Sequence, residues 1–413
     1  MVETAVRAAM TSLGASLLEQ LLAADTGHDG PRIECGAGHQ AGFVSYRTKT
    51  IATVLGPIEL RRAYYRCPDC RRGVVPRDQQ LDVAGVSLSP GLRAMTARAG
   101  TAAPFARAAA LLADLAGITL TTKRVERSTE ATGTALRAAQ AEQTQAILRG
   151  RLVPPPPPGP RPDMLYLAVD GTGLPMRASE TTGRVGKGPD GRARTREAKL
   201  AALFTQTKND DDGHPIRDPD STSYLATLHP VEHFADLVQA EARRRGSEHI
   251  RQLIILGDGA RWIWNLAEQR FPEATQIVDL YHAREHLHEL AALLEFIVPD
   301  PTAWLADRLT ELDNGDIEAI CAAARIYDLS GPKADAVDRA VAYFETNTHR
   351  MRYAHYRKLG MFVGSGVVEA GCKTVLGARL KQSGMHWTTR GATAITTLRC
   401  QHASRAWSQR DAA

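Results

Sequence analysis

Two runs of apolar residues, each ending in Asp-Gly, constrain the fold of this 413-residue chain more than any other feature. Residues 165–169 precede Asp170, and residues 253–257 precede Asp258. A strand without polar alternation is buried on both faces, which favours a sheet that helices cover on both sides. Ligands of such sheets gather at the carboxyl ends of the strands. The two runs therefore predict that Asp170 and Asp258 each close a strand and turn their oxygens toward a crevice.

The order of the elements around these runs indicates an α/β fold with a mixed sheet. Three strands come first, and helices and strands then alternate. A helical stretch at 281–356 is too long for one connection and indicates an insertion before a final helix that begins near Gly366. The expected strands are 165–169, 199–205, 223–228, 252–256 and 275–278, and the expected helices between them are 231–244 and 262–269.

A third carboxylate stands alone in a basic segment. Between Thr346 and Arg410 the chain has eleven Lys or Arg residues and one acid, Glu369. If this segment lies along phosphates, a carboxylate is tolerated only where a cation lies between the two. Mg²⁺ prefers oxygen ligands, and two such ions about 3.5–4 Å apart promote phosphodiester cleavage. We therefore expect Asp170, Asp258 and Glu369 to bind two Mg²⁺ or Mn²⁺ ions.

Simpler interpretations of the three acids remain open at this point. Each Asp-Gly could be an ordinary turn, since this dipeptide is common where strands end. Glu369 could be a surface residue of a helix that pairs with Lys373 one turn later.

Cysteine and histidine residues form two pairs around a predicted β-hairpin, residues 43–54 and 58–66. Cys35-x₃-His39 precedes the hairpin, and Cys67-x₂-Cys70 follows it. Tetrahedral Zn²⁺ needs four such ligands, and the hairpin would bring the two pairs together. A reduced thiol pair without metal is the alternative, and His28 is a substitute candidate for the first pair.

Composition and charge divide the chain into regions. The run of prolines between Pro154 and Pro160 favours a stiff extended spacer. Helices at 104–116 and 122–139, separated by a short turn with a glycine, fit either a helix-turn-helix or an ordinary αα-hairpin. The predicted regions are an N-terminal helix (1–28), a zinc-ribbon-like unit (29–85), a helical region (86–150), a proline-rich linker (151–162), and an α/β domain (163–413) with a helical insertion at about 283–356.

Basic residues in three of these regions are candidate DNA contacts, because Lys and Arg bind phosphates. Solvated surface charge is the alternative for all of them. The chain has no apolar run of the roughly 18–20 residues that a membrane span requires, and no secretory signal, so a cytoplasmic protein is expected. The candidate DNA contacts are Arg61, Arg62, Arg66, Lys123, Arg124, Lys373, Arg379, Lys381 and Arg390.

Taken together, these residues resemble the DDE transposases of bacterial insertion sequences, and more narrowly the Kra group, which is related to the Mutator-like transposases. The resemblance covers nearly the whole chain. It is carried by Asp170, Asp258 and Glu369 at their spacing, by Asp279-Leu-Tyr-His282, by Gly364-Ser-Gly-Val-Val-Glu369, and by the stretches 60–67, 196–200, 204–206, 218–222 and 257–262.

The resemblance implies an RNase H-like catalytic domain in which Asp170, Asp258 and Glu369 bind two Mg²⁺ ions. Asp279 and His282 match the Asp-x-x-His signature of the Mutator-like relatives, which implies an accessory role. The implied activity is cleavage of element ends followed by strand transfer into target DNA, by a homo-oligomer that needs no nucleotide cofactor. A non-catalytic DNA-binding protein derived from a transposase and a nuclease without strand transfer are the alternatives.

Overall fold

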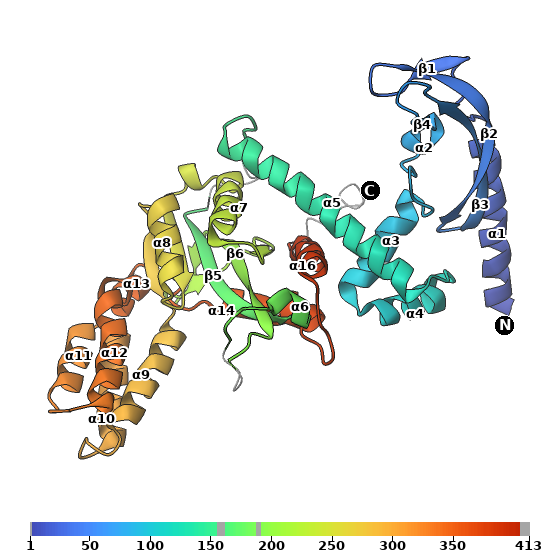
Figure 1. Ribbon diagram of the computed structural model, residues 1–413. Coiled ribbons are helices and arrows are strands. Elements are labelled where there is room, and N and C mark those ends of the chain that lie inside the picture. Colours follow the sequence, from blue (N-terminus) through green and yellow to red (C-terminus); the bar gives the residue numbers. More distant parts are fainter. Residues whose placement is uncertain (1, 155–161, 187–190, 405–413) are drawn as a thin grey trace. The chain divides into compact units, whose positions relative to one another are not determined.

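The computed structural model describes residues 2–154, 162–186 and 191–404 (Figure 1). The backbone forms two compact units, and the first ends at Leu136 while the second begins at Arg137. This division falls inside helix α5 (Thr122–Leu148), before the predicted linker at 151–162. Most of the proline run, residues 155–161, lies outside the described residues.

The first unit contains an antiparallel sheet of four strands in sequential order. The predicted hairpin is confirmed, since β2 (Gln40–Thr53) pairs with β3 (Gly56–Arg66) along its whole length. Helix α1 (Val2–Ala23) packs on this hairpin through Ala15, Leu18 and Leu22. The short elements of this region are β1 (Arg32–Glu34), β4 (Gly73–Val74) and α2 (Pro76–Gln80).

Three helices complete the first unit and share one apolar core, to which Leu92, Leu112 and Val125 contribute. Helix α4 (Phe105–Ala116) ends at Gly117, whose φ of 68° suits a glycine at a helix C-terminus. Helix α3 (Pro90–Ala102) lies close to α5, because a Cβ at Gly100 would stand 2.2 Å from the Thr129 hydroxyl. Helices α4 and α5 are confirmed, while their use as a helix-turn-helix stays a prediction.

The second unit is built on a five-stranded mixed sheet, so the predicted α/β class with a mixed sheet is confirmed. Its strand order is β11-β10-β5-β6-β9. Strand β6 is antiparallel to both β5 and β9, whereas β10 runs parallel to both β5 and β11. The strands are β5 (Met164–Pro175), β6 (Thr195–Gln206), β9 (Ser223–Thr227), β10 (Gln252–Gly257) and β11 (Thr275–Val278).

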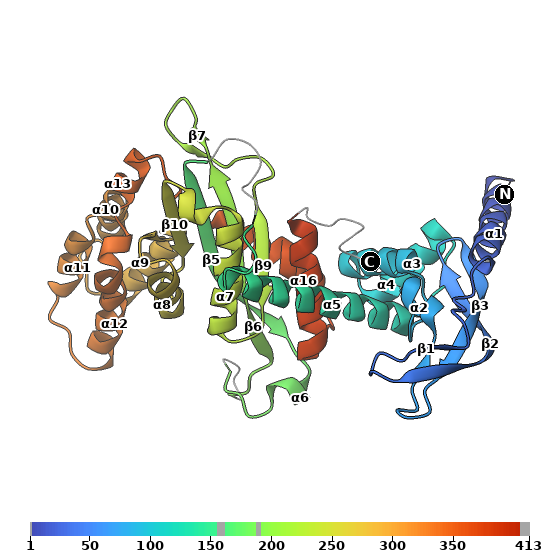
Figure 2. The same ribbon diagram turned by 90° about the horizontal axis from the view of Figure 1, so that it is seen from above.

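Helices cover both faces of this sheet, as the continuous apolar runs predict. Neighbouring side chains of β6 point to opposite faces. Lys199 approaches the Trp262 ring of α8 (Arg261–Arg270) at 5.5 Å, and a Cβ at Gly371 of α14 (Gly366–Gly371) would lie 2.9 Å from Leu200. The edge strand β9 carries α16 (Thr389–Ala403) beside it (Figure 2). Helix α7 (Val231–Arg244) also packs against β6 and β9.

The helical insertion is present between β11 and α14, and its helices gather in one bundle (Figure 1). The prediction of a final helix near Gly366 is wrong in one respect, since α16 follows it. That segment contains four Thr and one Gly, which are poor helix formers, and its burial against the sheet stabilises it. The insertion helices are α9 (Leu280–Leu294), α10 (Pro301–Asn314), α11 (Ile317–Arg325), α12 (Pro332–Asn347) and α13 (Tyr353–Lys358).

Helix α14 continues through a π-helical turn, Cys372–Gly377, into α15 (Ala378–Leu380). Within the described ranges, no helix is both long and apolar enough to cross a membrane.

Candidate metal centres

Asp170 lies in β5, two residues beyond the point where β5 stops pairing with β10. Strand β5 pairs with β10 only as far as Ala168, but it stays paired with β6 as far as Pro175. The expectation that Asp170 closes its strand, and the alternative that Asp170-Gly171 is a turn, are therefore both wrong. The long antiparallel partner β6 supplies hydrogen bonds to β5 beyond the point where β10 ends. Asp170 pairs with Leu200 of β6, so its side chain lies on the face of the sheet that α14 covers.

Asp258 and Asp279 stand at the same level on the next two strands. Leu256 pairs with Ala168, and Gly257 pairs with Val278. Counting onward along each strand brings Asp170, within β5, into line with Asp258 and Asp279, which directly follow β10 and β11. Neighbouring strands in a sheet are about 4.8 Å apart. The register thus gathers three acids that are up to 109 positions apart in the sequence.

The Asp258-Gly259 turn is fixed from two sides. The Asp258 carboxylate accepts a hydrogen bond of 2.8 Å from the amide of Ala260, at the start of α8. The Tyr343 hydroxyl of α12 donates to the Asp258 carbonyl at 3.1 Å, and burial raises the pKa of that hydroxyl. Gly259 has a φ of 96°, and a Cβ there would lie 2.7 Å from the Tyr343 ring. A glycine is therefore required, and the insertion helps to position Asp258.

Asp279 is a fully buried carboxylate that joins three elements. One carboxylate oxygen accepts a hydrogen bond of 2.9 Å from the His282 amide, and this bond caps the start of α9. The other oxygen accepts from the amide of Ser365, just before α14. The Asp279 amide itself donates to the carbonyl of Gly257 at 2.7 Å, at the end of β10. Its contacts make Asp279 a positioning residue for the surrounding acids.

Glu369 is held near this junction. The Ser365 hydroxyl donates to the Glu369 carboxylate at 3.4 Å. Ligand atoms of Asp279, His282 and Glu369 all lie within 4.8 Å of one another. No ion pair joins Glu369 to Lys373 among the described residues, so the surface-pair interpretation has no support there. Glu369 therefore approaches the sheet edge from the helix that packs against it.

The same helical segment also contacts Asp170. The Cys372 thiol, three residues after Glu369, lies near the Asp170 carboxylate. Burial and that negative charge raise the pKa of the thiol. The sequence alone indicated no role for Ser365 or Cys372. The i, i+3 spacing to Glu369 was the available signal, because residues three apart share one helix face.

Exposure distinguishes the four acids. Asp170, Asp258 and Glu369 are half-buried, whereas Asp279 is closed off and both of its oxygens already accept backbone N–H groups. The three half-buried carboxylates offer hard oxygen ligands that an incoming substrate can reach, which suits Mg²⁺ or Mn²⁺. His282 is also half-buried, and its ring contacts Glu285 at 3.2 Å.

The cysteine cluster in the first unit is a second candidate metal centre. Ligand atoms of Cys35, His39, Cys67 and Cys70 all lie within 4.8 Å of one another. The Cys35 and Cys70 sulfurs are 3.7 Å apart. Tetrahedral Zn²⁺ with Zn–S bonds of about 2.3 Å would hold two sulfurs about 3.8 Å apart, so this donor set fits zinc.

Local turns form this cluster. The Cys35 amide donates to the His39 carbonyl, and the Cys67 amide donates to the Arg72 carbonyl, each at 2.9 Å. A hydrogen bond with His39 lowers the pKa of Cys70 to about 6, which favours the thiolate that a metal binds. His28, the substitute candidate, instead hydrogen-bonds the Tyr65 hydroxyl at 3.2 Å and lies against the Phe43 ring.

Two of the predicted DNA contacts are engaged inside the protein. Arg379 is only 1% exposed and lies 5.3 Å from the centre of the Trp387 ring, and its burial lowers the pKa of the guanidinium to about 10. Arg62 forms an ion pair of 2.6 Å with buried Asp78. Both predictions are therefore wrong for this structure, because these side chains are held within the protein and do not face the solvent.

The other predicted DNA contacts are more accessible. Lys381 reaches the Thr172 hydroxyl, two residues beyond Asp170, and Arg124 donates to Ser87 at 2.8 Å. Arg61 lies 4.1 Å from the centre of the exposed Tyr46 ring. The exposed members of the set are Arg61, Arg66, Lys123, Lys373, Lys381 and Arg390.

The fold and these clusters define a mixed α/β protein with a cysteine-rich cluster near its N-terminus. Over residues 232–408 the chain is similar to a family described as Uncharacterised protein family (UPF0236). The matched segment includes Asp258, Asp279 and Glu369, and it begins after Asp170. A comparison with curated proteins gives no match.

Proposed function

We propose that this protein is a DDE-type DNA transposase of a bacterial insertion sequence, related to the Kra group. It binds the ends of its element, cleaves phosphodiester bonds there, and joins the freed 3′-hydroxyl to target DNA. The supporting observation is the strand register, which aligns Asp170 with Asp258 at one sheet edge beside the helix that carries Glu369.

The strand order supports an RNase H-like catalytic domain, which is the fold that the resemblance implies. Three antiparallel strands come first, and two strands parallel to the first are added on its other side. The helical insertion separates the last strand from the Glu-bearing helix. One helical segment lies near Asp170 at Cys372 and is bound to Asp279 at Ser365, which supports a site that Glu369 shares with these aspartates.

Asp170, Asp258 and Glu369 would hold two Mg²⁺ or Mn²⁺ ions. Bound there, such ions activate a nucleophilic oxygen and stabilise the leaving oxygen of a phosphodiester. The protein's own contribution is to hold the carboxylates in place. Asp279 does this by fixing α14 to the ends of β10 and β11, and Tyr343 does it by fixing the Asp258 turn.

Two further features suit a DNA substrate. Exposed Lys373, Lys381 and Arg390 follow Glu369 in sequence and can bind phosphates, which would concentrate DNA near the carboxylates. In the first unit, zinc bound by Cys35, His39, Cys67 and Cys70 would fix a sheet that displays Arg61 and Arg66.

A supercoiled donor plasmid tests the proposal. It carries the DNA that flanks the chain's own gene, and it is incubated with the protein and Mg²⁺. We expect double-strand ends and joined products from the wild type and none from Asp170→Asn. Glu295→Gln, an exposed acid at the end of α9, is the matched control and should stay active.

Each of the other outcomes would indicate a different function for this protein. Full activity of Asp170→Asn would overturn the metal-dependent mechanism. A wild type that binds the ends without cutting them would be a non-catalytic DNA-binding protein. Nicked DNA that is never joined would indicate a nuclease without strand transfer.

A further inference from the structure

Helix α1 presents large apolar side chains to solvent. It is 22 residues long, and none of its residues is buried among the residues that the structure describes. Six large apolar side chains on this helix are 51–78% exposed, which is unusual for a single helix. Contiguous exposed apolar patches of more than a few hundred Å² mark interaction sites. The six residues, named here the α1 stripe, are Val2, Val6, Met10, Leu13, Leu17 and Leu21.

The stripe lies on one side of the helix. At 3.6 residues per turn, the six positions fall within an arc of about 100°. Val6, Met10, Leu13 and Leu17 follow the 4-3-4 spacing of a coiled-coil seam. A helix with this spacing can pack against another helix along its whole length.

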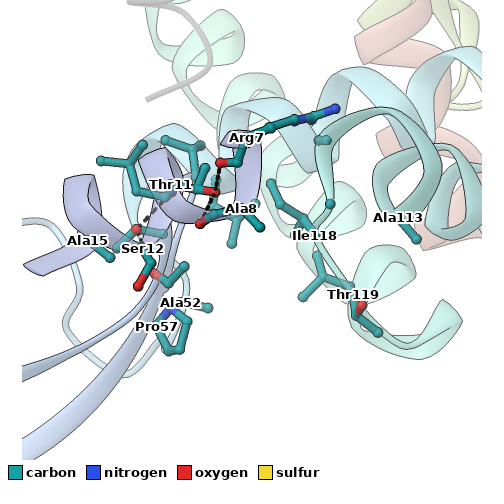
Figure 3. Close-up of a pocket in the computed structure, with 18 of the residues that line it drawn as sticks. Arg7, Ala8, Thr11, Ser12, Ala15, Ala52, Pro57, Ala113, Ile118 and Thr119 are labelled. Atoms are coloured by element: carbon teal, nitrogen blue, oxygen red, sulfur yellow. Dashed lines mark hydrogen bonds between the residues drawn. The ribbon is translucent and has the colours of Figure 1, made fainter. Parts of the chain in front are cut away.

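The opposite side of α1 is already used. Ala15, Leu18 and Leu22 pack on the β-hairpin. Between α1, the hairpin tip and the end of α4 lies a cleft of about 690 Å³ (Figure 3). Arg7 and Thr11 line this cleft, whereas none of the six stripe residues does. The stripe is therefore a separate second face of α1, and the fold of the first unit does not require it.

We propose that the α1 stripe pairs with the α1 stripe of a second copy of this chain, as an antiparallel two-helix seam. The stripe is self-complementary in that orientation. Positions that sum to 23 face each other, so Val2 meets Leu21, Val6 meets Leu17, and Met10 meets Leu13. The same arrangement sets Glu3 beside Gln20. A parallel pair would instead set Glu3 against Glu3, and like charges repel.

The area of the stripe suits a dimer. Six apolar side chains that each lose roughly 100 Å² to a partner bury about 1,200 Å² over the two copies, the lower end of the range for a specific interface. The inference does not depend on the proposed catalysis, since the α1 stripe contains none of the candidate metal ligands.

The mass of the full-length chain in solution, without DNA, tests the pairing. Light scattering over a range of concentrations should give twice the chain mass of 44.8 kDa. Met10→Glu/Leu17→Glu should weaken association by at least about 100-fold, because charges would be buried in the seam. Ala5→Glu/Ala23→Glu adds the same charge to exposed positions outside the stripe and should leave the dimer intact.

Mixing two variants tests the orientation. Met10→Glu in one copy and Leu13→Lys in the other face each other in an antiparallel seam, so the mixture should form heterodimers where each variant alone is monomeric. Circular dichroism should show the same helix content in all variants, since the altered side chains are exposed.

Three results would overturn the inference. The first is a wild type that stays monomeric at all concentrations. The second is a dimer that survives Met10→Glu/Leu17→Glu unchanged, which would place the interface elsewhere. The third is a monomeric wild type that Met10→Glu/Leu17→Glu destabilises to heat, which would mean that another part of the same chain covers the stripe.

Discussion

The two candidate metal centres are assembled in opposite ways. The cysteine cluster takes its ligands from the two ends of one hairpin, within residues 35–70. The carboxylates come from β5, the end of β10 and a helix that follows the insertion, and they span residues 170–369. The first set is close-packed and made of soft donors. The second set is half-exposed and made of hard oxygen donors, and buried Asp279 positions it.

This difference fits the roles that we propose, a structural one for the cysteine cluster and a catalytic one for the carboxylates. Four close ligands leave no position for a substrate, as in structural zinc sites. Carboxylates that remain partly open to solvent can share their ions with a phosphate. We therefore expect loss of the first centre to change stability, and loss of the second to change activity.

The largest expected effect is the loss of the cysteine centre. Cys67→Ser should remove zinc and unfold the first unit, because structural zinc contributes on the order of 10 kcal/mol of apparent binding free energy. Metal analysis and thermal unfolding measure this. Cys321→Ser, in α11 and away from both centres, should keep the zinc. If Cys67→Ser lost its zinc but kept the stability of the wild type, the cysteine cluster would have no structural role and would not differ from the carboxylates in this way.

Glu369→Gln should have a large effect of the opposite kind. We expect DNA cleavage to fall by about 10³-fold, which corresponds to about 4 kcal/mol of transition-state stabilisation. The free energy of unfolding should stay within about 1 kcal/mol of the wild type, because Glu369 is half-buried and accepts one long hydrogen bond. Paired cleavage and urea-unfolding measurements check both. A large loss of stability would make Glu369 a structural residue.

Asp279→Asn should lower both quantities. One of the two backbone N–H groups that the carboxylate binds would face an amide NH₂, so about 2–3 kcal/mol of stability should be lost. Cleavage should fall with it, because α14 is no longer fixed to the sheet edge. Stability should distinguish the two variants, because Glu369→Gln is expected to keep the wild-type free energy of unfolding and Asp279→Asn is not. Asp279→Asn with normal stability and no cleavage would indicate direct participation in the chemistry.

The smallest expected effect separates two neighbouring arginines of the zinc-ribbon-like unit. Arg61→Gln should weaken binding to end DNA by less than about 10-fold, as for the loss of one phosphate contact, with unchanged stability. Arg62→Gln should instead destabilise the first unit by about 1–3 kcal/mol, because it leaves buried Asp78 with one cation fewer. Filter binding at fixed salt and thermal unfolding measure the two effects. Equal effects of both changes would mean that Arg62 also reaches DNA.

Much of the fold follows from the sequence because its signals are local. The apolar runs predicted β5 and β10, and the spacing of elements predicted the mixed sheet and the insertion. The extension of β5 to Pro175 did not follow, because it depends on pairing with β6. Helix α16 was missed because its composition disfavours helix, and only burial against β9 stabilises it.

The candidate centres were predictable in part for the same reason. The spacing of the paired cysteines predicted their cluster, and Asp-Gly after an apolar run marked the end of β10 but not of β5. Arg379 looked like a phosphate contact because the segment around it is basic, yet its side chain folds inward onto Trp387. The roles of Ser365 and Cys372 arise from contacts with residues about 90 and 200 positions away, which no local pattern encodes.

The hydrogen bond from Tyr343 to the Asp258 carbonyl has a practical consequence for anyone who wishes to shorten this protein. A helical bundle inserted between a strand and a helix looks dispensable, and deleting it would give a shorter protein. Here Tyr343 of the bundle holds the carbonyl of Asp258, and Asp279 caps the first helix of the bundle. A trimmed version must therefore supply a replacement for that hydroxyl and for the cap of α9.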